Sequence, residues 1–144
     1  MDPVAVSVAW QRLQTTVSST AGAEGETAYN GLSIVLPTFN EGGSIQQVIQ
    51  SLLSLTSHRA IEILVVDDDS RDGTADLVRQ LARQDPRIRI IQRVGRSGLA
   101  SAIKEGLIAA IHPIAVVMDS DGQHEPSAVL EAVRCLEAGG FDLV

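Results

Sequence analysis

The chain has 144 residues, 44% of them hydrophobic, and a formal net charge of -7. This length fits one domain, or part of one, with a sizeable core, and the composition is that of a folded protein and not of a disordered one. The negative charge argues against nucleic acid as a partner, because phosphate backbones need a basic surface. No apolar run approaches the roughly 20 residues that cross a bilayer, and no signal peptide is evident, so we expect a soluble chain.

The first 30 residues differ from the rest, because the stretch "TTVSSTAGAEGETAYNG" is small, polar and glycine-bearing with no sustained period, which predicts a flexible leader before a domain at 31–144. An alternative is a short amphipathic helix that touches a membrane or a partner. Its apolar face would be formed by Val6, Trp10, Leu13 and Val17. We favour the frayed tail, because so short a helix is marginally stable alone.

From residue 32 onward, short apolar segments rich in β-branched residues alternate with helical patterns. The predicted strands are 32–37, 61–67, 88–93 and 114–119. The apolar faces of the predicted helices are Ile45, Val48, Ile49, Leu52 and Leu53; Leu77, Val78, Leu81 and Ala82; Leu99, Ile103 and Leu107; and Val129, Leu130, Val133 and Leu136. The alternation predicts an α/β fold with a mostly parallel sheet. We expect "FDLV" at 141–144 to begin a further strand, inside which the chain stops.

The single cysteine, Cys135, excludes a disulfide framework and a thiolate metal site within the chain. This usage fits a reducing compartment. Because the residue falls on the apolar side of the last predicted helix, we expect its thiol to lie in the core.

Polar clusters follow each predicted strand, at 37–41, 67–74, 93–98 and 119–124. In an open α/β sheet these segments share one edge, where ligands bind. Each cluster alone is also explained as a solvated loop with helix caps, and Ser44 and Asp72 are plausible N-caps. That explanation is less plausible for all four clusters together, because purely structural turns would not require carboxylates at the ends of two different strands.

Asp119 and Asp121 follow a buried strand with one serine between them. Two carboxylates so close repel each other unless a positive charge lies between them, and a divalent metal is the simplest such charge. The sequence has neither a GxGxxG nor a GxxxxGK[ST] motif, so a bound diphosphate would need that metal. Carboxylate oxygens suit Mg²⁺ or Mn²⁺.

Four segments, "LSIVLPTFNE", "ILVVDDDSRDGTADLV", "SGLASAIKEG" and "VVMDSDGQHEP", resemble in order and spacing the motifs of family 2 glycosyltransferases. Within that family they are most similar to polyprenyl-phosphate sugar transferases of the dolichol-phosphate mannosyltransferase type. The resemblance covers about 32–144 and implies the nucleotide-binding half of a GT-A domain. It therefore implies a Rossmann-like, three-layer α/β/α fold that is truncated here.

The resemblance also implies roles for individual residues. The nucleotide-binding residues would be Pro37, Phe39, Glu41, Asp67, Asp68 and Asp119, with Asp67 hydrogen-bonded to the base. Asp119 and Asp121 would be the catalytic pair, and the metal would be held by Asp119, Asp121 and Gln123.

Five further polar residues are placed less specifically. Asp69 is an additional carboxylate that the resemblance leaves without a role. His124 either orients the metal ligands or caps the next helix. We expect Arg93, Arg96 and Lys104 to be solvated surface charges, with neutralisation of phosphate as the alternative.

The implied activity is metal-dependent, inverting transfer of a hexose from a nucleotide-sugar of the GDP-mannose or UDP-glucose type to a polyprenyl phosphate. An ionised lipid phosphate needs no general base to become nucleophilic. We expect the protein in the cytoplasm or at the cytoplasmic face of a membrane, with membrane association through a region after Val144. We also expect the 144-residue chain alone to bind nucleotide at best weakly, to transfer no sugar, and to self-associate through an uncovered sheet edge.

Two alternatives remain. "ILVVDDDS" also resembles the acidic start of a Mg²⁺-binding receiver domain, with Asp119 as the phosphate acceptor. That pattern leaves 32–55 unexplained and requires a later lysine, whereas no lysine follows Lys104. The second alternative is an inactive fragment that retains only the nucleotide-binding fold.

Overall fold

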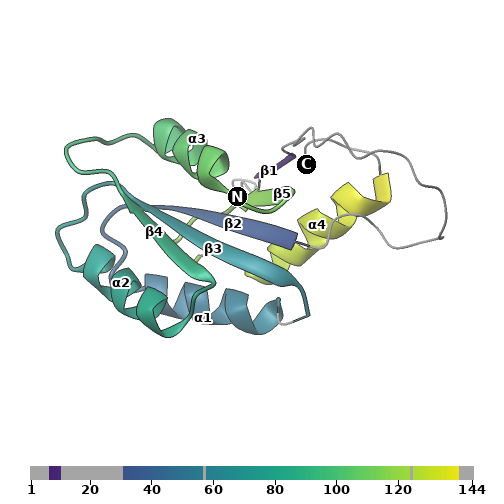
Figure 1. The fold of residues 1–144 in the computed structure, drawn as a ribbon, viewed down its shortest axis with the longest axis horizontal. Helices are drawn as coiled ribbons and strands as arrows, with labels where there is room; N and C mark the ends of the chain where they lie inside the picture. The colour runs from purple at the N-terminus through teal and green to yellow at the C-terminus, as the bar shows by residue number, and fades with distance from the viewer. Residues whose placement is uncertain (1–6, 11–30, 57, 124, 140–144) are drawn as a thin grey trace.

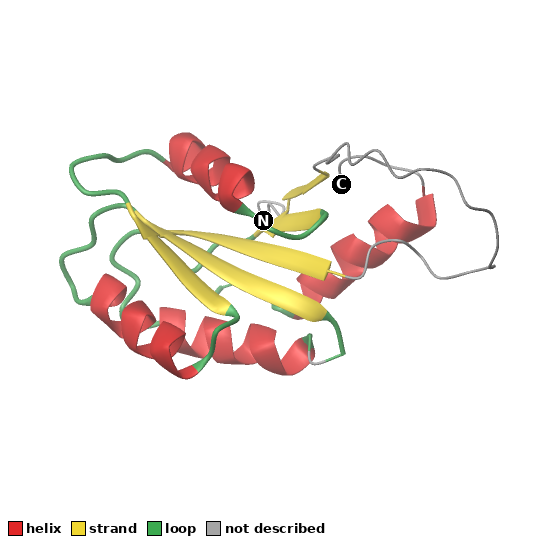
Figure 2. Cartoon of the chain, viewed as in Figure 1, coloured by secondary structure: helices red, strands yellow, loops and turns green. Residues whose placement is uncertain are grey.

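The computed structural model describes residues 7–10, 31–56, 58–123 and 125–139, which form one sheet flanked by helices (Figures 1 and 2). The strands, in the spatial order β1-β5-β2-β3-β4, are β1 (Ser7–Trp10), β2 (Gly31–Thr38), β3 (Ala60–Asp67), β4 (Ile88–Gln92) and β5 (Ile114–Val117). The helices are α1 (Ile45–Leu55), α2 (Thr74–Gln84), α3 (Leu99–Ala109) and α4 (Ser127–Gly139). None of these helices, within the described part of the chain, is long and apolar enough to span a membrane.

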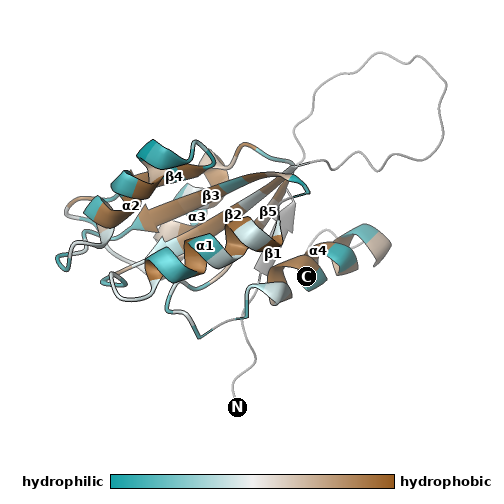
Figure 3. Cartoon of the chain, turned by 90° about the horizontal axis from the view of Figure 1, so that it is seen from below, coloured by the Kyte–Doolittle hydropathy of each residue, from teal (hydrophilic) through white to brown (hydrophobic). Residues whose placement is uncertain are grey.

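The architecture has three layers, as predicted. Strands β2 to β5 are parallel, and successive residues of β2 point to opposite faces of the sheet. Ile34 and Leu36 belong to the core that includes α1, α2 and α4, whereas Val35 packs with Ala102 of α3 on the other face. Helices α1, α2 and α4 each carry both apolar and polar residues, coloured brown and teal in Figure 3. The mostly parallel α/β fold is therefore confirmed.

Strands β2 and β3 are continuous apolar runs because both of their faces are covered. Every residue of β2 is buried, and in β3 only Ala60 is exposed. The two strands pair in register, with Val35 opposite Leu64 and Thr38 opposite Asp67. Their carboxyl ends therefore lie side by side, which brings the loops after them together.

Strand β1 differs from the expectation of a flexible leader. Ser7–Trp10 pairs antiparallel with β5, and Trp10 lies opposite Ile114. The expectation was wrong for these four residues, and Trp10 is not on a helix. By pairing with β5, strand β1 covers an edge of β5 that would otherwise be free. The paired residues are more than 100 positions apart in the sequence, so a local sequence pattern could not predict this strand. The rest of the expected leader and the expected strand at 141–144 lie outside the described residues.

Two predicted core positions are exposed. Helix α3 approaches the sheet through Ala102 and Gly106, while Leu99 is 60% exposed. Cys135 on α4 is also exposed, because the buried side of that helix runs through Val129, Ala132, Val133 and Leu136. In both helices the buried side is rotated from the side that the apolar pattern predicted. Helix α3 packs on the sheet through its small residues, and each residue turns the helix by 100°, so Cys135 points away from the core although Leu136 next to it is buried.

Replacing Gly106 with alanine should destabilise the protein by about 1 to 2 kcal/mol, because overpacking exceeds the gain in helix propensity. An added Cβ would lie 3.0 Å from Val66 Cγ2 and closer still to Val35 Cγ1. Urea denaturation measures the change. Gly43→Ala is the matched control, since its Cβ would meet no atom within 4 Å. Equal stability of both variants would contradict the close packing of α3.

A buried charge that no sequence pattern indicates lies near the amino ends of β2 and β3. Glu62 is 1% exposed and accepts hydrogen bonds from Ser33 Oγ at 2.6 Å and from the Ile111 amide at 3.1 Å. It also forms an ion pair with Arg89. The His112 amide donates to Ser33 Oγ at 3.1 Å, so this network fixes the connection between α3 and β5.

Candidate functional site

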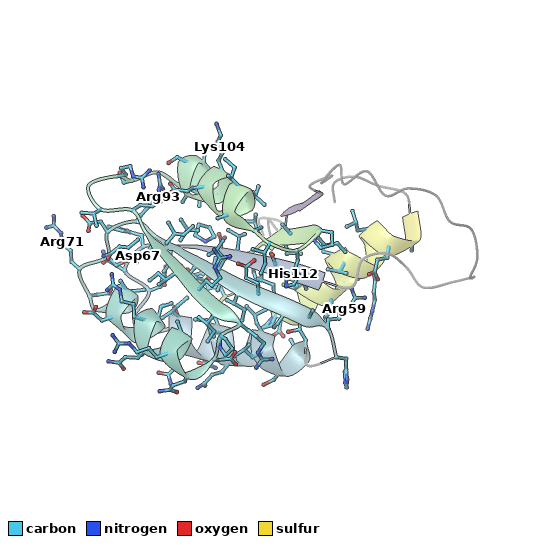
Figure 4. The ribbon with its side chains drawn as sticks, viewed as in Figure 1. Arg59, Asp67, Arg71, Arg93, Lys104 and His112 are labelled. Atoms are coloured by element: carbon cyan, nitrogen blue, oxygen red, sulfur yellow. The ribbon has the colours of Figure 1, made fainter. Side chains whose placement is uncertain are left out.

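A cavity of about 350 Å³ lies where β2, β3 and β5 end. Its lining residues are Pro37, Thr38, Phe39, Glu41, Asp68, Leu99, Ala102, Asp119, Ser120 and Asp121. The structure thus brings together all the predicted site residues except Asp67 and Gln123. Asp67 and Arg93 lie at this end of the sheet, and His112 lies towards the other end (Figure 4).

The alternation after β5 explains why the two aspartates share a cavity. Ser120, between them, is 3% exposed, and its hydroxyl donates to the Pro37 carbonyl at 3.1 Å. The Asp121 carboxylate accepts a bond from the Gln123 amide at 2.9 Å, and Gly122 turns the chain with φ 78°. The serine therefore anchors the loop to β2, a role that the sequence did not reveal.

Ser44 joins the same loop to the start of α1. It occupies the N-cap position without a capping side-chain bond, so the predicted cap is correct in position and wrong in function. Its hydroxyl instead donates to the Ser120 carbonyl at 2.9 Å and lies 3.1 Å from Glu41 Oε2. This contact fixes Glu41 against the loop that carries the aspartates.

The loops after β2 and β3 are joined by hydrogen bonds from backbone amides to side-chain oxygens. The Asn40 amide donates to Ser70 Oγ at 2.8 Å, and the Arg71 amide donates to Asn40 Oδ1 at 2.9 Å. Asn40 has φ 54°, a conformation that asparagine tolerates better than most residues. These bonds make the two loops one wall of the cavity.

Asp72 links the same two loops and is not the N-cap of α2, which is Gly73. Its Oδ1 accepts bonds from the Thr74 hydroxyl at 2.5 Å and the Thr74 amide at 3.0 Å. Its Oδ2 accepts from the Gly42 amide at 2.9 Å. The bond from the Thr74 hydroxyl, followed by that from Gly42, holds the pKa of Asp72 below its ordinary value of 3.8.

Asp72→Asn should lower thermal stability at neutral pH and make little difference in acid. Because folding lowers the pKa of this carboxyl, its stabilising contribution is present above the ordinary value near 3.8 and is lost as the pH falls below it. Melting curves from pH 3 to 7 measure the gap between the variant and the wild type. Asp76→Asn, an exposed carboxylate on α2, is the control. A gap that stays constant down to pH 3 would contradict this role.

The two adjacent aspartates after β3 have different environments. Asp67 is fully buried and lies outside the cavity lining; its Oδ2 accepts from the Ser70 amide at 3.1 Å. Its Oδ1 is buried without a hydrogen-bond partner among the described residues. Asp68 is 8% exposed and lines the cavity. Of the pair, Asp68 is therefore the residue that a ligand in this cavity can reach.

Arg93 is buried, contrary to the expectation of a surface charge. Its side chain is 4% exposed and pairs with Asp68 at 2.5 Å, because the guanidinium lies under the loop that follows β4. Arg96 is 58% exposed beside Glu105, and Lys104 is exposed, as expected.

A second cavity of about 370 Å³ adjoins the first and shares Phe39 and Asp68 with it. Its other lining residues are Asp69, Arg71, Gly95, Arg96 and Ser97. Asp69, which the sequence left without a role, has φ 59° and accepts a bond from the Gly95 amide at 3.3 Å. It therefore ties the loop after β4 to the end of β3.

Gln123 is exposed and His124 lies outside the described residues. Within the described part of the chain, no group of three or more His, Cys, Asp or Glu side chains is arranged to hold a metal. Asp119 and Asp121 nevertheless line one cavity. Mg²⁺ and Mn²⁺ are commonly bound by one or two carboxylates together with substrate phosphates, so this pair fits such an ion.

Comparison with known proteins gives a consistent result. The family model described as "Glycosyl transferase family 2" matches residues 33–144. A dolichol-phosphate mannosyltransferase of Pyrococcus furiosus is 32% identical over 108 residues, which cover 75% of this chain and 30% of that protein.

Two solved structures are similar in fold. The mannosyltransferase PcManGT of Pyrobaculum calidifontis, in complex with GDP-Man and Mn²⁺, aligns with a TM-score of 0.63 and 27% identity over 73% of this chain and 32% of its own. Glucosyl-3-phosphoglycerate synthase of Mycobacterium tuberculosis, with Mn²⁺, UDP and phosphoglyceric acid, aligns with a TM-score of 0.62 and 30% identity over 76% and 40%.

The chain thus spans 30% to 40% of the length of these three relatives. Those relatives are glycosyltransferases with the GT-A fold, and the match extends from β2 through the paired aspartates. The assignment replaces the receiver-domain alternative, since the family model also accounts for residues before 56 that a receiver pattern leaves unexplained. The chain belongs to glycosyl transferase family 2, the enzymes of which transfer sugars.

Proposed function

We propose that this chain is the donor-binding part of a metal-dependent, inverting hexosyltransferase that uses a nucleotide-sugar of the GDP-mannose or UDP-glucose type. The observation that supports this most is the single cavity lined by Phe39, Asp68, Asp119 and Asp121. It combines an aromatic ring and a buried carboxylate on one side with two carboxylates on the other. These are the groups that a base and a diphosphate need.

The base would lie against Phe39 and Asp68. Phe39 is 59% exposed, lines both cavities and offers its ring as a stacking surface. An ionised carboxylate only accepts hydrogen bonds, so Asp68 placed opposite the ring nitrogen of the Watson–Crick edge would select bases with an N–H at that position. Guanine N1 and uracil N3 carry a proton there, whereas adenine N1 and cytosine N3 are acceptors and these two bases donate only from their exocyclic amino groups. We therefore assign the base contact to Asp68 in place of Asp67.

The diphosphate would lie against Asp119 and Asp121, with Pro37 and Glu41 bordering the nucleoside. We propose these two aspartates as metal ligands, with Gln123 as a further ligand. A divalent cation there would stabilise the charge that develops on the departing diphosphate. The chain's own contribution is to hold the two carboxylates together through Ser120 and Ser44.

For the acceptor we propose a polyprenyl phosphate, at the cytoplasmic face of a membrane. Relatives named dolichol-phosphate mannosyltransferase support it, whereas the glucosyl-3-phosphoglycerate synthase of Mycobacterium tuberculosis was solved in complex with phosphoglyceric acid. An ionised lipid phosphate needs no general base. Because the 144-residue chain alone is expected to transfer no sugar, transfer assays on a protein in which this chain is part of a whole glycosyltransferase domain, with labelled sugar nucleotide and either polyprenyl phosphate or 3-phosphoglycerate, decide between them. Product from 3-phosphoglycerate alone would overturn the lipid acceptor.

A thermal-shift panel tests the donor. With Mn²⁺ present, GDP or UDP should raise the melting temperature, while ADP and CDP at equal concentration should not, because binding stabilises by mass action. The shift should disappear when EDTA removes the metal. Equal shifts with all four nucleotides would contradict selection by Asp68, and no shift with any of them would contradict nucleotide binding.

A further inference from the structure

Arg93 lies just after β4, beneath the cavity wall and outside the lining of either cavity. Its Nη1 is 2.5 Å from Asp68 Oδ1 and also donates to the Gly98 carbonyl at 3.2 Å. Its Nη2 donates to Ser101 Oγ at 2.5 Å, and its Nε lies 3.2 Å from Glu105 Oε2. One buried guanidinium thus joins the end of β3 to the first turns of α3.

Asp68 is held on both of its oxygens. While Oδ1 pairs with Arg93, Oδ2 accepts a bond from the Gly98 amide at 2.8 Å. Each carboxylate oxygen has two lone pairs, so each keeps one for a ligand. The orientation of the carboxylate plane is therefore set from behind, by groups that a ligand in the cavity does not touch.

The loop between Arg93 and Gly98 is tied to the end of β3 along its length. The Arg93 amide donates to the Asp67 carbonyl at 2.8 Å, and the Gly95 amide donates to Asp69 at 3.3 Å. Gly95 and Gly98 have φ 67° and 127°, which most other residues avoid. The buried Arg93–Asp68 ion pair contacts both ends of this loop, because the Gly98 carbonyl accepts from Arg93 and the Gly98 amide donates to Asp68.

We propose that Arg93 is a positioning residue for recognition of the base, acting through Asp68; this inference rests on the proposed function. The guanidinium is itself held in place by the Gly98 carbonyl and Ser101 Oγ, so its Nη1 bond fixes Asp68 Oδ1 from one direction while the Gly98 amide fixes Oδ2; a lysine ammonium lacks the planar set of donors that makes these contacts together. With Arg93 in place, Asp68 presents a fixed acceptor to the N–H of guanine or uracil. Without it, the carboxylate loses this orientation.

Arg93→Lys is the test, and isothermal titration calorimetry on the 144-residue chain is the measurement. Nucleotide affinity, measured with GDP and UDP in the presence of Mn²⁺, should fall by about tenfold or more, the scale of one charge-assisted hydrogen bond. Affinity for Mn²⁺ pyrophosphate, which has no base, should stay within about twofold, because Arg93 does not reach Asp119 or Asp121. Preference for GDP and UDP over ADP and CDP should fall in parallel.

Two further variants make the result specific. Ser101→Ala removes one partner of Arg93 without changing a charge, and it should show a smaller loss of the same kind. Arg87→Lys, at the other end of β4, breaks an exposed pair with Asp85 and should bind every ligand as the wild type does. Circular dichroism melts confirm that each variant is folded.

The possible results distinguish an error in the role of Arg93 from an error in the proposed nucleotide binding. If Arg93→Lys bound nucleotide as tightly as the wild type, the inference would be wrong. Parallel losses for nucleotide and pyrophosphate would also overturn it, since they would indicate a purely structural role. A wild-type chain that bound Mn²⁺ pyrophosphate but no nucleotide would overturn the proposed function itself, and the inference with it.

Discussion

Replacing Asp119 or Asp121 with asparagine should remove metal-dependent binding of nucleoside diphosphate and leave the fold intact. Each substitution deletes an anionic ligand, and we expect affinity for GDP or UDP with Mn²⁺ to fall by more than about tenfold. Each also relieves repulsion between neighbouring carboxylates, so the melting temperature without ligand should be unchanged or slightly higher. Calorimetry with and without Mn²⁺ measures both effects.

Glu125→Gln is the matched control for these variants. It removes a carboxylate from the same connection between β5 and α4, but Glu125 does not line the cavity that holds the aspartates. It should bind nucleotide as the wild type does. If all three variants kept full affinity in the presence of Mn²⁺, the assignment of Asp119 and Asp121 as metal ligands would be wrong.

Glu62→Ala should cost about 2 to 4 kcal/mol of unfolding free energy, the largest stability loss expected from one polar side chain in the described structure. It leaves Ser33 Oγ and the Ile111 amide without their buried acceptor. It also leaves Arg89 without its partner, although this arginine, with 42% of its side chain exposed, can be rehydrated. Urea denaturation measures the loss.

Exposed Glu131 on α4 provides the comparison, and Glu131→Ala should change stability by less than about 0.5 kcal/mol. Nucleotide affinity of the Glu62 variant, measured well below its melting temperature, should be normal, because the network lies at the opposite end of the strands from the cavity. A loss no larger than that of the control would show that the buried carboxylate contributes nothing to the fold.

The order and type of the main elements could be predicted from the sequence because local patterns determine them. The four parallel strands begin and end within a few residues of their predicted limits, since buried β-branched runs and polar loop clusters alternate clearly. The clustering of Pro37, Phe39, Glu41, Asp119 and Asp121 followed from topology alone. Parallel strands place their carboxyl ends at one edge of the sheet.

What could not be predicted depends on contacts between distant segments. Burial of Arg93 requires α3 and the loop after β4 to fold over it, and the sequence near Arg93 shows only a polar stretch. Asp67 and Asp68 differ by one position at the end of a strand, and only the structure shows which one faces the cavity. The anchoring role of Ser120 likewise depends on Pro37, 83 positions earlier.

We propose that a divalent metal and a nucleoside diphosphate bind together in the cavity between Phe39 and the paired aspartates. A crystal structure of the chain soaked with Mn²⁺ and GDP or UDP, with anomalous data collected near the manganese edge, would show both ligands at once. We predict one strong anomalous peak in contact with Asp119 or Asp121 and the diphosphate, with the base beside Phe39 and Asp68. Nucleotide bound elsewhere, or bound in this cavity with no manganese near either aspartate, would contradict the account.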